Sequence, residues 1–125
     1  MKIKVATDKA PAALGQYSQA LVVDGTLYAS GQLGIDPATG EMPEAFEAQA
    51  KQVMLNMGAV LKEAGYDYSD VVKTTIFVDD LANFTVLNDI YGEYFTENQP
   101  ARSCVQAARI PTTVPSVFFK GARYA

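Results

Sequence analysis

Residues 70–78 read DVVKTTIFV, and this stretch decides the architecture of the chain. Apart from Asp70 and Lys73, every residue in it is β-branched or aromatic, which are the side chains that strands favour. We therefore predict a buried strand here. Apolar residues at helical spacing flank this strand on both sides, so the prediction extends outward from it.

The segment before the strand predicts an amphipathic helix from about Pro43 to Ala64. Its apolar residues recur at steps of three and four, which places them on one helical face. They are Phe46, Ala50, Val53, Met54, Met57, Val60, Leu61 and Ala64. A core face is the simplest use of such a stripe. Gly65 follows the last of these residues and can serve as the helix C-cap.

A second helix is predicted after the strand, from about Leu81 to Thr96. Its apolar set has the same spacing and comprises Phe84, Leu87, Ile90, Tyr91, Tyr94 and Phe95. Further strands are expected over 103–108 and 117–124, separated by a proline-containing loop.

The N-terminal half predicts a β-hairpin. Two short apolar runs, 20–23 and 26–30, are joined by Asp24-Gly25, a dipeptide typical of tight hairpin turns. With the helices and later strands, this gives a single α+β domain over residues 1–125, with two helices on one face of a mixed sheet. The other face needs cover, and at this length a second subunit is the expected cover, so we predict a closed homo-oligomer.

The composition excludes several classes of function. The net charge is −4, which disfavours nucleic acid as the main partner because phosphate binding requires a basic surface. The chain has no histidine, which removes Ser–His and Cys–His chemistry and His-ligated metal sites. The single cysteine forms no internal disulfide and fits a reducing, cytoplasmic compartment. No apolar run is long enough to cross a membrane, and no signal-peptide core is present.

Several blocks of the sequence, in order along the chain, carry a family resemblance: Ala10–Ala12, Gly15–Ala20, Leu27–Gln32, Asp36–Gly40, Ala48–Ala50, Val72–Val78 and Pro100–Val105. Together they resemble the RidA/YjgF family of reactive-intermediate deaminases. Pro100–Val105, which reads PARSCV, is the most specific of them. The resemblance extends to about Pro111.

The resemblance implies a fold and an activity. The fold is a chorismate-mutase-like α+β domain, three copies of which pack their sheets into a barrel-like core with pockets at the subunit interfaces. The activity is hydrolysis of reactive enamines and imines, such as 2-aminoacrylate and 2-iminobutanoate, to 2-oxo acids and ammonia. It implies no cofactor and no metal.

Arg102 is the expected anchor for the substrate. An imino acid carries a carboxylate beside its C=N carbon, and a guanidinium grips a carboxylate with two parallel hydrogen bonds. A surface arginine in a rim ion pair is the alternative. Gly31 resembles the family's backbone amide donor to the same ligand, and glycine permits that close approach.

Three further residues resemble members of the family pocket. Tyr17 matches a pocket tyrosine, with ordinary packing and a solvated hydroxyl as the alternative. Asn88 matches an asparagine contributed at the interface, with an exposed helical residue as the alternative. Cys104 matches a pocket cysteine whose backbone contacts the ligand, and we do not expect a nucleophile there.

The last strand departs from the family. Active members resembling this chain place a glutamate there, which orients or activates the attacking water. Here Val117 stands at that position, or Phe118 after a one-residue loop adjustment, and neither transfers a proton. The whole stretch after Pro111 fits the family poorly. The alternative function is therefore a non-catalytic trimeric binder of small 2-oxo or amino acids.

A third class of function is translation inhibition through RNA, a role attached to some relatives. The acidic sequence pI of about 4.6 opposes it. The lack of histidine also opposes it, because ribonuclease chemistry usually needs a base and a cluster of phosphate-binding cations.

Overall fold

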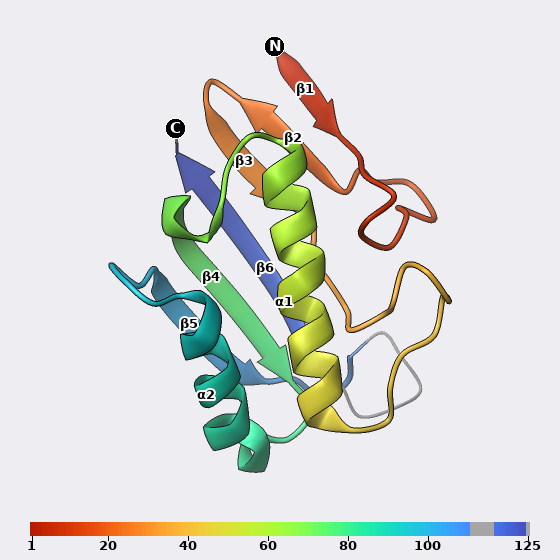
Figure 1. The fold of residues 1–125 in the computed structure, drawn as a ribbon, viewed down its shortest axis with the longest axis vertical. Helices are drawn as coiled ribbons and strands as arrows, with labels where there is room; N and C mark the ends of the chain where they lie inside the picture. The colour runs from red at the N-terminus through yellow and green to blue at the C-terminus, as the bar shows by residue number, and fades with distance from the viewer. Residues whose placement is uncertain (111–116, 125) are drawn as a thin grey trace.

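The computed structural model describes residues 1–110 and the backbone of residues 117–124, which together build one mixed sheet crossed by two helices (Figure 1). In sheet order the strands are β1 (Lys2–Val5), β2 (Ala20–Val23), β3 (Thr26–Ala29), β6 (Val117–Tyr124), β4 (Val71–Val78) and β5 (Ala101–Gln106). The helices are α1 (Phe46–Glu63) and α2 (Phe84–Tyr94), and short 3-10 turns at Tyr68–Asp70 and Leu81–Asn83 precede β4 and α2.

The sheet is antiparallel except at one edge. β4 and β5 run parallel, with Thr74 opposite Arg102 and Ile76 opposite Cys104. Parallel neighbours need a long crossover, and α2 provides it. β6 inserts between β3 and β4, so the end of the chain separates the N-terminal strands from the pair that carries Arg102.

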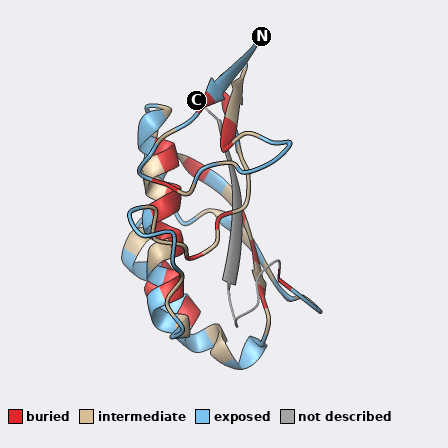
Figure 2. Ribbon diagram, turned by 90° about the vertical axis from the view of Figure 1, so that its right-hand side faces the viewer, coloured by how far each residue is buried: buried red, intermediate tan, exposed pale blue. Residues whose placement is uncertain are grey.

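Both helices lie on the same face of the sheet, as Figure 2 shows in side view. The predicted α+β arrangement is therefore confirmed. The core lies between the helices and this face. Its largest fully buried apolar side chains are Leu27, Val53, Met54, Val60, Ile76, Val78 and Leu87. No helix in the described part of the chain is both long and apolar enough to cross a bilayer.

β4 is buried on one face only, which corrects the prediction of a buried strand. Thr74, Ile76 and Val78 face the helices and are buried, whereas Phe77 is partly exposed on the opposite face. The register shifts between Val71 and Lys73, and the intervening Val72 is left 43% exposed. In one chain, then, the second face of the sheet has no helical cover.

The predicted hairpin is confirmed, and its turn shows why the dipeptide matters. Asp24 and Gly25 both have positive φ, at 49° and 78°, as a tight turn between twisted strands requires. β1 pairs with β2 beyond this hairpin, and its strand was not predicted. Its residues, KIKV, alternate charged and apolar side chains, but over four positions only, and Val5 alone of the four is buried.

The first helix begins later than predicted, at Phe46 instead of Pro43. The Gln49 side-chain amide donates to the carbonyls of Pro43 and Glu44, which holds these residues in a loop ahead of the first turn. The C-cap is Ala64, one residue before the predicted Gly65, and Gly65 follows it with a φ of +85° and donates its N–H to the carbonyl of Lys62.

The second helix is shorter than predicted at both ends. Leu81–Asn83 forms a 3-10 turn capped by the Asp80 carboxylate, which accepts from the N–H of Ala82 at 2.8 Å. The α-helix ends at Tyr94, and Phe95 leaves helical geometry although its side chain is buried. Burial continues one residue past the helix, so apolar spacing overestimates its length. The strand β5 is displaced from its prediction: it begins at Ala101 and ends at Gln106, each two residues earlier than predicted.

Candidate functional site

Arg102 lies at the centre of a cluster on the edge strand β5. Its Nη1 donates to Oδ1 of Asn88 on α2 at 2.9 Å. Its guanidinium carbon is 4.8 Å from the ring centroid of Tyr91 and 5.4 Å from that of Phe84. Stacking on two rings plus one hydrogen bond fixes the plane of the guanidinium. We call Arg102, Asn88, Phe84, Tyr91 and Cys104 the arginine cluster.

Tyr91 is itself held from beneath. Its hydroxyl shares a 2.8 Å hydrogen bond with the hydroxyl of Thr74 on β4, and both residues are buried. Burial raises the pKa of the Tyr91 phenol, partly offset by the Thr74 hydrogen bond and the Arg102 charge, so the ring stays neutral at physiological pH. The aromatic support beneath Arg102 is therefore rigid and uncharged.

Arg102 keeps donors available for a ligand. A guanidinium has five N–H groups, and only one is used for Asn88. Within residues 1–110, no carboxylate forms an ion pair with Arg102, so the rim ion-pair alternative is not observed there. A partly exposed, oriented guanidinium of this kind suits a carboxylate that arrives from outside.

Cys104 lies two residues further along β5 and packs against the core. Burial raises the pKa of its thiol, and the nearby Arg102 charge lowers it by a smaller amount. A raised pKa leaves the sulfur protonated at neutral pH, whereas a nucleophilic cysteine needs a thiolate. This agrees with the expectation that Cys104 is not a nucleophile.

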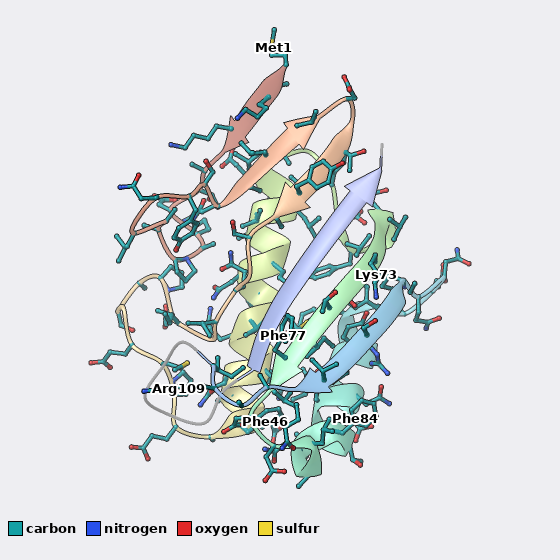
Figure 3. The ribbon with its side chains drawn as sticks, turned by 180° about the vertical axis from the view of Figure 1, so that it is seen from behind. Met1, Phe46, Lys73, Phe77, Phe84 and Arg109 are labelled. Carbon is teal, nitrogen blue, oxygen red and sulfur yellow. The ribbon has the colours of Figure 1, made fainter. Side chains whose placement is uncertain are left out.

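Gly31 and Tyr17 lie elsewhere, in a hollow of about 1240 Å³ beside β2 and β3. Tyr17 is 54% exposed there. Tyr28 and Phe77 contribute from the sheet face that the helices leave open, and Figure 3 views this face with Phe77 labelled. We call this feature the hollow. Its other lining residues include Leu14, Ser18, Gln19, Leu21, Ser30, Gln32, Leu33 and Ile35.

The loop after Gly31 is fixed to α1 by a buried asparagine. Asn56 is fully buried, and its Nδ2 donates to the carbonyls of Leu33 and Ile35 at 3.0 and 2.9 Å. Gly34 lies so close to α1 that an added Cβ would stand 2.6 Å from the Gln49 carbonyl oxygen. Asn56 positions this loop although its role was not predicted. A polar residue among the apolar positions of the helix was the available signal.

The other wall of the hollow is held by Gln19. Its Oε1 accepts from the N–H of Thr7 at 2.7 Å, and its Nε2 donates to three carbonyls, those of Thr7, Ala10 and Pro11. Ser30 adds a second link, because its hydroxyl donates to the carbonyl of Ser18 at 2.6 Å. The Gln19 bonds hold the loop before β2 together, and the Ser30 bond attaches that loop to the residue after β3.

The arginine cluster and the hollow do not meet within one chain. β6 and β4 separate β3 from β5, which corresponds to about 14 Å at the usual strand spacing. The two features also use different sides, since Arg102 contacts α2 whereas Tyr28 and Phe77 point away from the helices. The predicted residues therefore form two groups, one of Arg102, Asn88 and Cys104 and one of Gly31 and Tyr17.

The position of the expected glutamate is defined by the backbone alone. Val117 pairs with Val78 and Phe118 with Phe77 at the start of β6. Their side chains, and all of residues 111–116, lie outside the described residues. Among the side chains that are described, no three His, Cys, Asp or Glu residues are grouped as metal ligands would be.

Comparison with known proteins places the chain in a family. Residues 7–116 match the sequence model of the family described as Endoribonuclease L-PSP. The chain is also 48% identical over 108 residues to the 2-iminobutanoate/2-iminopropanoate deaminase of Bos taurus, covering 86% of this chain and 79% of the relative. The chain belongs to the RidA/YjgF/L-PSP family. The resemblance predicted from the sequence is thus confirmed.

Other relatives of this RidA-family chain agree. It is 52% identical to the chloroplastic Reactive Intermediate Deaminase A of Arabidopsis thaliana, over 86% of this chain and 58% of that one. The crystal structure of RidA from an Antarctic Psychrobacter superposes with a TM-score of 0.94 at 45% identity, covering 98% and 99% of the two chains. E. coli TdcF with bound serine superposes with a TM-score of 0.93 at 32% identity, covering 98% of each chain.

Proposed function

We propose that this chain hydrolyses reactive 2-imino and enamine acids, such as 2-iminobutanoate and 2-aminoacrylate, to 2-oxo acids and ammonia. The observation that carries the proposal is the orientation of Arg102, stacked over Tyr91 and Phe84 and bonded to Asn88. That arrangement suits the carboxylate common to all these substrates. Relatives of about half-identical sequence are named for this activity.

The reaction requires only water and proton transfers. An enamine first takes a proton at its terminal carbon and loses one from its nitrogen, which gives the imine. The oxygen of water then bonds to the imine carbon and its proton moves to nitrogen, which gives a carbinolamine. The hydroxyl proton passes to the nitrogen as the C–N bond breaks, so ammonia leaves and the 2-oxo acid remains. Holding the carboxylate and the water together is the main contribution that a pocket makes.

The proposed pocket combines two subunits. β3, which leads to Gly31, and β5, which carries Arg102, are about 14 Å apart in one chain, and Arg102 contacts α2 on the other side of the sheet, so one small imino acid cannot contact both residues. In a closed, chorismate-mutase-like trimer of 1–125 domains, the Arg102, Asn88 and Cys104 of one copy would face the Gly31 and Tyr17 of the next. The uncovered sheet face, where Tyr28 is 54% and Val105 44% exposed, supports this assembly.

A second function has its own support. Val117 or Phe118 stands where the family resemblance places a glutamate, and a positioned acid–base group is typically worth about a hundred- to ten-thousandfold in rate. Without that group, the same pocket would act as a trimeric binder of small 2-oxo or amino acids. A cytoplasmic location is proposed for either function, because the chain uses one reduced cysteine.

One competition assay separates the two functions. A threonine dehydratase generates 2-iminobutanoate, semicarbazide traps it, and the protein is added in increasing amounts. A deaminase lowers the yield of semicarbazone formed directly from the imine, and Arg102→Ala abolishes that effect. If the yield is unchanged while 2-oxobutanoate still binds in an Arg102-dependent manner, the binding function stands and the deaminase proposal fails.

A further inference from the structure

The ring of Tyr91 needs more than its hydroxyl bond to hold its plane. The hydroxyl oxygen of a tyrosine lies on the axis of the Cβ–Cγ bond, so the ring can turn about this axis without moving that oxygen. The 2.8 Å bond to Thr74 therefore fixes the hydroxyl but not the direction in which the ring faces, which only packing restricts. Arg102 stacks over this ring, 4.8 Å from its centroid, and the stacking depends on that direction.

Phe95 packs against the Tyr91 ring and restricts this rotation. The two ring centroids are 4.5 Å apart, with an interplanar angle of 36°. Phe95 is 2% exposed and is the C-cap of α2, where its N–H donates to the Tyr91 carbonyl at 3.0 Å. Its own carbonyl accepts from Nε2 of Gln99 at 3.2 Å. The backbone of Phe95 is thus held on both sides, so its ring is a fixed neighbour for the tyrosine.

Tyr68 holds the ring of Phe95 in turn. The two rings meet edge to face, with centroids 5.6 Å apart and an interplanar angle of 89°. The Tyr68 hydroxyl donates to the Met54 carbonyl on α1. This hydroxyl lies so close to Gly58 that a Cβ added there would overlap it. Burial raises the pKa of Tyr68 to about 12, so its phenol remains a hydrogen-bond donor at neutral pH.

We propose that Phe95 and Tyr68 are positioning residues for Arg102, which hold the Tyr91 ring in the plane on which the guanidinium stacks. This proposal rests on the proposed function, in which the guanidinium binds the substrate carboxylate. Phe95 is too deeply buried to touch the substrate, so its influence reaches Arg102 through Tyr91. An arginine that is already ordered loses less side-chain entropy when a carboxylate binds.

The NMR spectrum of the arginine side chains tests the positioning without any ligand. The chain has three arginines, Arg102, Arg109 and Arg123, and the Arg102→Lys variant identifies the Arg102 Nε–H resonance by its loss. A proton stacked over an aromatic ring resonates upfield. We expect Phe95→Leu, which keeps an apolar side chain but no ring, to move this resonance downfield, toward that of an unstacked arginine. Tyr68→Phe should move it in the same direction by less, because the ring of residue 68 remains.

Tyr66→Phe is the matched control for Tyr68→Phe. Each substitution removes one phenol hydroxyl that donates to a backbone carbonyl, that of Gly25 for Tyr66 and that of Met54 for Tyr68. Both variants should therefore lose a similar amount of thermal stability. Only Tyr68→Phe should move the Arg102 resonance. An equal movement in both variants would overturn the proposal.

Calorimetric titration with 2-oxobutanoate measures what the positioning contributes to binding. We expect Phe95→Leu to weaken binding about two- to fivefold, the factor that corresponds to a cation–π contact at a partly exposed site. The loss is modest because Phe84 and Asn88 still contact the guanidinium. In the Arg102→Lys background most of the stacking is already gone, so there Phe95→Leu should change the affinity little. An equal loss in both backgrounds would show a purely structural role and overturn the proposal.

The outcomes separate this proposal from the proposed function. An unchanged Arg102 resonance in folded Phe95→Leu and Tyr68→Phe overturns the positioning, and the deaminase proposal survives if 2-iminobutanoate is still hydrolysed. A shifted resonance in a protein that neither binds 2-oxobutanoate nor hydrolyses 2-iminobutanoate supports the positioning and rejects the proposed function. Circular dichroism establishes that each variant is folded. If Phe95→Leu does not fold, the comparison of Tyr68→Phe with Tyr66→Phe decides.

Discussion

At the residue scale, the site depends on how Arg102 is oriented more than on its charge. The ring of Tyr91 lies under the guanidinium, Asn88 holds one edge of it, and Thr74 holds the tyrosine. Each of these contacts helps to fix the orientation of the guanidinium N–H groups that would bind a carboxylate. The sequence predicted Arg102 and Asn88 as separate ligands, but the hydrogen bond between them could not be predicted, because it depends on the crossing of α2 over β5.

Replacing the planar guanidinium of Arg102 by the ammonium group of lysine should weaken the binding of a carboxylate ligand. In Arg102→Lys the positive charge remains, but the bidentate geometry and most of the stacking on Tyr91 are lost. We expect 2-oxobutanoate affinity to fall about 10- to 100-fold, measured by calorimetry. Arg109→Lys is the matched control, since Arg109 is exposed and outside the arginine cluster. An equal loss of affinity in both variants would mean that the guanidinium geometry of Arg102 has no specific role in binding the acid.

Cys104 should behave as a slow, weakly acidic thiol. Because burial raises its pKa, the thiolate fraction at pH 8 is below that of a free cysteine, and the alkylation rate should continue to rise at more alkaline pH. Iodoacetamide labelling across pH 7–10 measures this. The Arg102 charge lowers the pKa, so in Arg102→Gln the midpoint should move higher still. A midpoint at or below that of free cysteine would contradict this account.

At the element scale, the decisive contact joins the loop after β3 to α1. Asn56 binds two of the loop's carbonyls, and Gly34 allows the two backbones to approach. Sequence periodicity predicted α1 and the strand before the loop, because local spacing determines both. It did not predict β1 or this contact, since each depends on partners 15 or more residues away.

Adding a methyl group at Gly34 should destabilise the fold. Its Cβ would stand 2.6 Å from the Gln49 carbonyl oxygen and 2.8 Å from the Gln49 Cα, so helix and loop must separate. We expect Gly34→Ala to cost about 1–3 kcal/mol in urea unfolding. The Gly92→Ala change is the control: its Cβ meets nothing within 4 Å in α2, and it should stabilise by about 0.5–1 kcal/mol. Similar effects in both would show that the contact at Gly34 is unimportant.

At the scale of the whole molecule, one chain carries the two halves of a pocket on different sides. The family and the arrangement of two helices on one face of a mixed sheet were predicted from sequence and are confirmed. The resemblance implied pockets at subunit interfaces, but which of the predicted residues share a side of the chain was not evident from sequence, because the position of β6 between β3 and β4 is a long-range feature of the sheet. The proposed trimer brings the halves together, so assembly and binding should be lost together.

Placing a charge on the open sheet face should separate the subunits. Val105 is 44% exposed on that face, and Val105→Asp would bury a carboxylate at the proposed interface. Light scattering should give about 40 kDa for the unsubstituted protein, three times 13.5 kDa, and a monomer for the variant. Val86→Asp is the control, with 41% exposure on α2, and should stay trimeric. A monomeric unsubstituted protein would remove the interface pocket.

Mixed trimers test most directly the central claim that two copies share each pocket. Arg102→Ala removes the anchor, and Gly31→Val places a branched side chain in the hollow, so each homotrimer should be folded but inactive toward 2-iminobutanoate. In a random 1:1 mixture, about a quarter of the interfaces join an intact Arg102 to an intact Gly31. The account predicts that mixing restores about a quarter of the unsubstituted activity in the semicarbazide competition assay. No recovery in mixtures shown to contain mixed trimers would contradict it, because the two residues would then have to act within one chain.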